Sequence, residues 1–120
     1  MSDHDDAERE ALEAAERWLA LVDAGDYGQA WEHAASLMRG AVTKDVLSES
    51  LQRARGMFGA VRSRSATSKT YAASLPGAPD GEYVVIQMAA SFEHKQQAIE
   101  TITPKKEPDG TWRVSGYYIS

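Results

Sequence analysis

The chain contains no cysteine, which excludes disulfides, thiolate catalysis and cysteine-ligated zinc. It also lacks any run of about 18 apolar residues, the length that a membrane-spanning helix requires. The first six residues include three aspartates and no lysine or arginine, where a secretion signal would be basic and then apolar. We therefore expect a soluble protein with no membrane span and no export signal in the sequence as given. Such a chain would be cytoplasmic, or periplasmic or in the cell envelope if a leader had been removed.

Basic charge is scarce: 13 lysines and arginines stand against 18 acidic residues, for a net charge of -5. The acidic excess lies in residues 1–38, whereas residues 39–69 are net basic. Neutralised phosphates supply most of the affinity for nucleic acid, so an acidic chain without a long basic stripe is a poor nucleic-acid binder. We predict no nucleic-acid partner, although the basic middle segment suits a small anion or an acidic partner surface.

The length of 120 residues, with 42% apolar and 26% charged residues, is typical of one globular core. There is no internal repeat, low-complexity segment or linker. We predict a single domain over residues 1–120, with a disordered tail of about residues 1–6.

Apolar residues recur at three- and four-residue steps over the first half of the chain, which predicts amphipathic helices. Gly25 is placed to end the first helix, and Asp26 with Gln29 resembles a capping box that opens the second. Thr43 is placed to cap the third. We expect helices over residues 7–24, from Asp26 to Gly40, and from Thr43 to Gly56 or Gly59.

Beyond Ala60 the period changes to two and residues suited to strands become frequent. Turn residues separate the runs at Pro76–Gly81, around Lys95 and at Pro108–Gly110. We expect strands over residues 61–75, 82–92, 97–106 and 111–119. The predicted fold class is α+β, with three N-terminal helices packed on one face of a curved four-stranded antiparallel sheet. Such an arrangement leaves a conical pocket between helices and sheet.

Glu100 is the acid of most interest. A tight turn near Lys95 would place Ala90 opposite Glu100 and put this carboxylate on the apolar face of the sheet. Because a buried acid needs a partner, we expect an ion pair with Arg64 of the first strand. The pair has two interpretations: a structural one, fixing the register of the sheet, and a functional one, as a polar point in an apolar pocket. A register slip that exposes Glu100 is a third possibility.

Aromatic residues supply the other candidates. Trp18, Trp31 and Trp112 fall on predicted buried faces and suit the core. Tyr117 and Tyr118 point to opposite faces, so one of them faces inward. The candidate ligand-binding residues are Arg64, Glu100, Tyr118 and Trp31.

Histidine offers little chemistry. His33 lies near Asp23 and Asp26, which makes an acid–base pair conceivable, but it falls off the apolar stripe and suits the surface. His4 and His94 have no second ligand at helical spacing. We predict no metal, no cofactor and no catalytic residue.

One resemblance covers nearly the whole chain. It is carried by Trp18-Leu19, Val22–Tyr27, Trp31, Ser63-Arg64, Leu75–Val84, Glu100-Thr101 and Gly110–Tyr117. This pattern resembles the bacterial domain-of-unknown-function family 4019. The resemblance implies a nuclear transport factor 2-like, cystatin-like fold and implies no activity.

We favour a non-catalytic module that binds a small ligand or a protein partner in the cone. A homodimer through the exposed sheet face, with Tyr83, Val85 and Ala89, is a further expectation. The alternative is a small enzyme of the isomerase or hydrolase type, using a carboxylate and a tyrosine in the cone. A purely structural or interaction protein is the third class.

Overall fold

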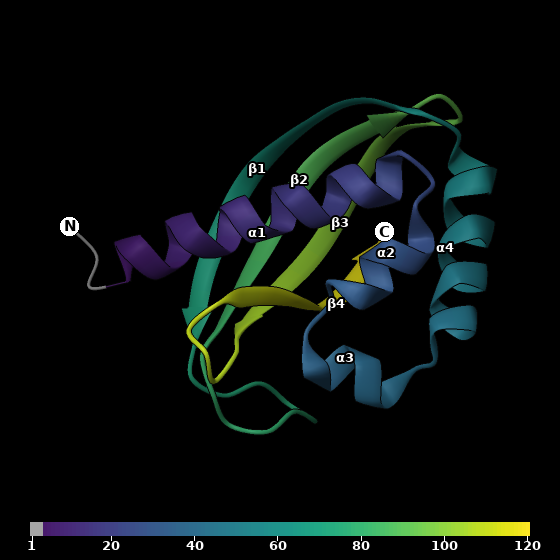
Figure 1. Ribbon diagram of the computed structural model, residues 1–120. Coiled ribbons are helices and arrows are strands. Elements are labelled where there is room, and N and C mark those ends of the chain that lie inside the picture. The colour runs from purple at the N-terminus through teal and green to yellow at the C-terminus, as the bar shows by residue number, and fades with distance from the viewer. Residues whose placement is uncertain (1–3) are drawn as a thin grey trace.

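The structure, a computed structural model, describes residues 4–120 and places helices before strands along the chain (Figure 1). The helices are α1 (Asp5–Asp23), α2 (Tyr27–Glu32), α3 (Ser36–Ala41) and α4 (Lys44–Phe58). The strands are β1 (Val61–Ala72), β2 (Tyr83–Phe92), β3 (Lys95–Lys106) and β4 (Trp112–Ile119). The predicted α+β class is confirmed. The tail predicted over residues 1–6 lies partly outside the described residues, and its Asp5 and Asp6 belong to α1.

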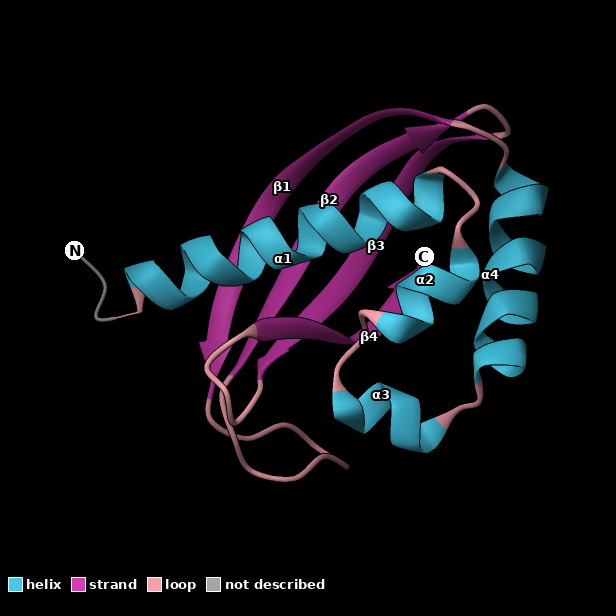
Figure 2. Ribbon diagram, in the orientation of Figure 1, coloured by secondary structure: helices cyan, strands magenta, loops and turns pink. Residues whose placement is uncertain are grey.

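Helix α1 crosses the curved sheet and packs against all of its strands (Figure 2). Small side chains allow this close approach: Ala11 and Ala15 are fully buried, and Ala14 is nearly so. Trp18 and Leu19 continue the same face into the core. Within the described range, none of the helices has the length and apolar content needed to cross a bilayer.

The end of α1 is a glycine-dependent cap, as the sequence predicts. Gly25 has a φ of 76°, and its N–H donates to the Val22 carbonyl at 3.0 Å. The Asp26 N–H donates to the Leu21 carbonyl at 2.9 Å, which completes a Schellman motif. This turn sets the position of Asp23, one residue before the cap.

The predicted second helix is two short helices, so the expectation of three helices is wrong. Ala35 adopts an extended conformation between α2 and α3, and its N–H donates to the Val114 carbonyl of β4 at 2.8 Å. Glu107 then accepts hydrogen bonds from the N–H of Ser36 at 2.6 Å and from its hydroxyl at 3.2 Å. These long-range bonds outweigh the local helical preference of the segment.

Capping of the later helices differs from the sequence prediction in one respect. Asp26 precedes α2 but makes no side-chain capping bond, so the capping box with Gln29 does not form. Thr43 does cap α4, because its Oγ1 accepts from the Val46 N–H at 3.2 Å. Helix α4 ends at Phe58, and the capping residue that follows, Gly59, has a φ of 78°.

The sheet is antiparallel with the strand order β1-β2-β3-β4, as predicted. The register between β2 and β3 differs from the prediction: Met88, rather than Ala90, lies opposite Glu100. Strand β3 begins at Lys95, within the predicted turn, and this earlier start moves the pairing by two residues. A shift of two preserves the face on which each side chain lies, so Glu100 still points into the core.

Candidate functional site

The candidate site is built around Glu100, in the middle of β3, whose side chain is fully buried. A carboxylate removed from water is costly unless hydrogen bonds and opposite charge compensate for the lost hydration. Glu100 obtains both from side chains on other elements.

Arg64 of β1 is the first partner. Its Nε donates to Glu100 Oε1 at 2.5 Å and its Nη2 donates to Oε2 at 3.1 Å, a bidentate ion pair. The two strands are separated by β2, and the residue of β2 that pairs with Arg64 is Ala90. The small alanine lets the long arginine side chain reach across β2. The predicted pairing of Arg64 with Glu100 is confirmed.

Asp23 and Arg55 extend this pair to the helices. Asp23, at the end of α1, accepts from Arg64 Nη1 at 2.8 Å and from Nη2 at 3.0 Å. Arg55 of α4 places its Nη1 2.8 Å from Asp23 Oδ1. Two carboxylates and two guanidiniums thus alternate along one chain of contacts. We call Asp23, Arg55, Arg64 and Glu100 the ion-pair cluster.

The contacts of the cluster favour the charged forms of Asp23 and Arg64. Burial would raise the pKa of Asp23, but hydrogen bonds and charge from Arg64 and then Arg55 outweigh it and hold the pKa below its usual value. Burial also acts to lower the pKa of Arg64, and the carboxylates of Asp23 and Glu100 more than reverse this. The cluster has equal numbers of positive and negative groups and is therefore neutral as a whole.

Tyr117 of β4 adds a phenol to the cluster. Its hydroxyl donates to Glu100 Oε2, and its ring meets Trp18 edge-on with centroids 5.3 Å apart. Burial raises the pKa of Tyr117, and the adjacent Glu100 raises it further, so the phenol stays protonated. Both oxygens of Glu100 therefore accept hydrogen bonds, and the Tyr117 hydroxyl uses its one proton to donate to the carboxylate.

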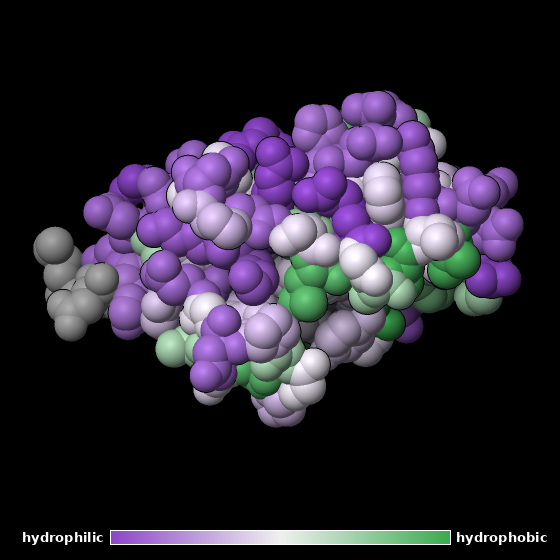
Figure 3. Space-filling view, turned by 60° about the horizontal axis from the view of Figure 1, so that its bottom comes forward, coloured by the Kyte–Doolittle hydropathy of each residue, from purple (hydrophilic) through white to green (hydrophobic). Residues whose placement is uncertain are grey.

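An apolar pocket lies between α4 and the end of β4, with a volume of about 380 Å³. We call it the α4 pocket. Its lining is Trp18, Met38, Leu47, Ser50, Leu51, Ala54, Met57, Phe58, Tyr117, Tyr118 and Ile119. None of these side chains is charged, and Tyr117 alone joins the pocket to Glu100. Apolar surface gathers on the side of the molecule that carries α3 and α4, whereas the α1 side is mostly polar (Figure 3).

Comparison with known proteins places this chain in a family. Residues 14–117 match the profile of a protein family of unknown function, DUF4019. The chain belongs to the DUF4019 family. The resemblance stated from the sequence is thereby confirmed at the level of the family. The family name assigns no activity.

A solved structure supports the fold of this DUF4019 chain. The crystal structure of the Kfla4162 protein from Kribbella flavida is similar, with a TM-score of 0.54 over 96% of this chain and 90% of that one. The two sequences are 12% identical, so the likeness concerns the fold alone. A search of curated proteins finds no match.

The fold brings together only part of the predicted site of this DUF4019 chain. Arg64 and Glu100 meet as described, but Tyr118 is 60% exposed and lies at the rim of the α4 pocket. Trp31 lies in α2, where its Nε1 donates to the Val42 carbonyl at 2.9 Å, and it does not line the pocket. Trp31 is also only half-buried, unlike Trp18.

Sequence reasoning missed the inward tyrosine because β4 contains an irregularity. Thr103 pairs with Gly116, and the next residue of β3, Pro104, pairs with Val114. The extra residue in β4 reverses the alternation, so Tyr117 rather than Tyr118 turns inward. Asp23 and Arg55 were missed as partners because they come from α1 and α4, and no local pattern links them to Glu100. Within residues 4–120, no group of three or more potential metal ligands gathers.

Proposed function

We propose that this DUF4019 protein is a non-catalytic module that binds a small, mainly apolar ligand in the α4 pocket. The observation that carries the proposal is the composition of that pocket: an uncharged, largely apolar lining with Tyr117 as its link to buried charge. Pockets of this kind use a few fixed polar groups to orient a ligand.

The direction of the hydrogen bond made by the Tyr117 hydroxyl restricts which polar groups the ligand can carry. A tyrosine oxygen both donates and accepts, and here the proton is donated to Glu100. The oxygen retains acceptor capacity, so a ligand with an N–H or O–H group on an apolar body is favoured. Glu100 and Arg64 act as positioning residues for Tyr117 and do not contact the ligand.

The alternative of a small enzyme is disfavoured by the same contacts. A general base needs a free oxygen within hydrogen-bond reach of the substrate. Both Glu100 oxygens already accept hydrogen bonds, from Arg64 and from Tyr117. Proton transfer to Glu100 would require breaking a buried bidentate ion pair, which is costly.

We also propose that the fold is of the bacterial nuclear transport factor 2-like, cystatin-like type. A helix-covered, curved antiparallel sheet with a pocket between α4 and β4 supports this assignment. The proposal extends the family resemblance and rests on architecture alone.

The neutral fluorophore N-phenylnaphthylamine is a suitable probe, because it combines an apolar body with one N–H donor. We expect saturable fluorescence enhancement with the natural protein. Ala54→Trp fills the α4 pocket and should abolish binding, whereas Gln52→Trp, on the exposed part of α4, should leave it intact.

Tyr117→Phe tests the anchor in the same titration. It removes the acceptor and keeps the ring, so affinity should fall about fivefold, the value of one hydrogen bond. The matched control is Tyr27→Phe, since Tyr27 lies outside the pocket. Equal binding by Ala54→Trp and the natural protein would rule out the pocket as the site.

We further propose a homodimer through the outer face of the sheet. On this face Ala89 is exposed, Ile99 is 46% exposed and Tyr118 is 60% exposed. Tyr83, expected in the interface, is only 1% exposed, because its hydroxyl donates to the Pro79 carbonyl beneath the loop before β2. The interface would therefore lie nearer to Ile99 than to Tyr83.

Sedimentation at tens of micromolar tests the dimer. We expect twice the 13.1 kDa mass of the chain, and a shift to monomer with Ile99→Lys. Val46→Lys is the control, because Val46 is similarly exposed, at 49%, but lies on α4. A natural protein that sediments only as monomer would contradict the proposal.

A further inference from the structure

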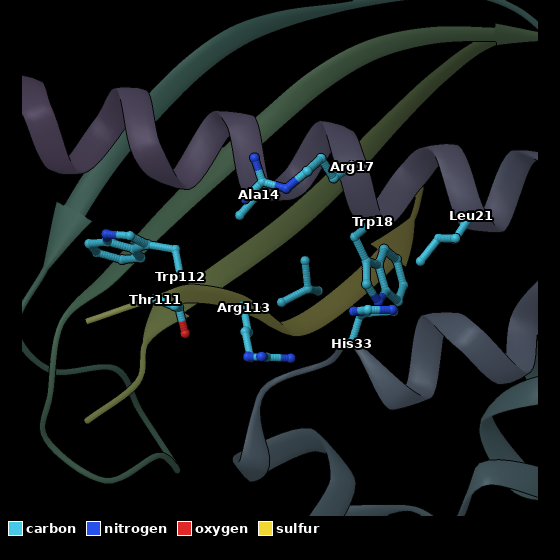
Figure 4. A pocket seen from close by; sticks show the side chains of 9 residues that line it. Ala14, Arg17, Trp18, Leu21, His33, Thr111, Trp112 and Arg113 are labelled. Atoms are coloured by element: carbon cyan, nitrogen blue, oxygen red, sulfur yellow. The ribbon is translucent and has the colours of Figure 1, made fainter. Parts of the chain in front are cut away.

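A second hollow, separate from the α4 pocket, lies between α1 and β4, with a volume of about 400 Å³. We call it the arginine groove. Arg17 extends from α1 on one side and Arg113 from β4 on the other, while Trp18 and His33 lie toward one end and Trp112 toward the other (Figure 4). Of the residues between His4 and Ser120, Trp18 alone lines both hollows.

The charge of the groove is opposite to that of its surroundings. Two arginines and a histidine line it, and none of the acidic side chains that the structure describes does so. Residues 1–38, by contrast, hold ten acidic and only two basic residues. A local excess of positive charge in an acidic protein concentrates small anions at that place.

Both arginines of the groove have free hydrogen-bonding capacity. Among residues 4–120, neither Arg17 nor Arg113 forms a salt bridge, whereas Arg9, Arg55 and Arg64 all do. The pKa of Asp109 is lowered mainly by hydrogen bonds from Thr111, and the positive charge of the nearby Arg113 lowers it further. The Oδ1 of Asp109, however, is engaged by the N–H and the hydroxyl of Thr111.

The floor of the groove is apolar. Trp18 and Trp112 are almost completely buried, and Val114 of β4, also buried, lines the groove with them. The indole N–H of Trp18 is already bonded to the Ala30 carbonyl at 2.8 Å, so this ring offers apolar surface to the groove. A simple inorganic anion would leave that surface uncovered, whereas a ligand with a flat apolar body would cover it.

We propose that the arginine groove is a second ligand site, which binds a small organic anion. The apolar body lies against Trp18 and Leu21, and the acid group is bound by the guanidinium of Arg17 or of Arg113, which extend from opposite sides of the groove. Guanidinium forks suit the oxygens of carboxylate, sulfonate and phosphate groups alike. This inference goes beyond the α4 pocket, whose lining is uncharged and selects a neutral ligand.

Anilinonaphthalene sulfonate is the matched probe, since it carries a sulfonate on the body of N-phenylnaphthylamine. To isolate the groove, the titration uses the protein with Ala54→Trp, in which the α4 pocket is filled. We expect this protein to bind the sulfonate probe and not the neutral one. Affinity should also fall when sodium chloride is raised from about 20 to about 200 mM, as expected for a partly exposed ionic contact.

Arg17→Gln combined with Arg113→Gln, in the same Ala54→Trp protein, should weaken binding of the sulfonate probe about tenfold, from the loss of one charge-assisted contact. The control pair is Arg53→Gln with Arg62→Gln, which makes the same charge change at exposed positions outside the groove. Unfolding curves show that each variant is folded. Equal weakening by both pairs, or no binding of the sulfonate probe, overturns the proposal.

The natural protein separates this inference from the proposed function. If Arg17→Gln with Arg113→Gln weakens binding of the sulfonate probe and leaves binding of the neutral probe unchanged, the result supports the arginine groove as an anion site. The proposal for the α4 pocket is then unaffected. Failure of the neutral probe alone would remove the proposed function and leave the groove standing.

Discussion

Glu100 is held by interactions of two kinds, and they differ in what their loss would do. The bidentate pair with Arg64 supplies opposite charge, whereas Tyr117 supplies a neutral hydrogen bond. Removing the phenol leaves the carboxylate paired, but removing the guanidinium leaves it buried without a counter-charge. The second change should therefore be far more destabilising, because a buried unpaired charge is costly.

Arg64→Met is the direct test at the residue scale. We expect it to lower the free energy of unfolding by about 3 kcal/mol or more, the usual loss when one partner of a buried pair is removed. Arg62→Met, at an exposed position two residues earlier on β1, should change it by less than about 0.5 kcal/mol.

The double variant Arg64→Met with Glu100→Leu should be more stable than Arg64→Met alone, because it leaves no uncompensated charge at Glu100. Urea unfolding of all four proteins completes the comparison. A double variant less stable than Arg64→Met would contradict this account, because it would show that the unpaired carboxylate of Glu100 is not what destabilises the single variant.

At the scale of the elements, the connection between α2 and α3 depends on residues remote in sequence. Glu107, after the end of β3, is 8% exposed and accepts both hydrogen bonds that Ser36 donates at the start of α3. Ala35 meanwhile bonds to β4. These contacts tie the short helix to the β3–β4 hairpin.

Glu107→Ala should leave the Ser36 N–H without its acceptor and cost about 1–3 kcal/mol of stability. Hydrogen exchange at the Ser36 amide should become faster at the same time. Glu49→Ala, on the exposed surface of α4, is the control and should affect neither measurement. Unchanged exchange at Ser36 would show that the Glu107 contact does not hold α3 in place.

The same elements show why part of the structure was predictable. Strand boundaries and the glycine cap at Gly25 follow from local residue patterns, and the sequence places them well. The face of Glu100 was correct even though the register was wrong by two, because strand alternation has a period of two. The irregularity in β4 shifts the register by one, so the choice between Tyr117 and Tyr118 was reversed.

At the scale of the whole molecule, buried charge and ligand sites are spatially separate but connected. The ion-pair cluster links α1, α4, β1 and β3, and Tyr117 carries it to β4. The apolar α4 pocket lies on one side of Trp18 and the arginine groove on the other. Such long-range assembly leaves no local sequence pattern, which is why Asp23 and Arg55 were not predicted as members.

Mapping the binding of N-phenylnaphthylamine by amide chemical-shift changes tests the proposed function most directly. If the α4 pocket is the site, the largest changes fall on α4 between Leu47 and Phe58 and on β4 between Tyr117 and Ile119. Shifts confined to the outer sheet face around Ile99, or to the arginine groove, would contradict it.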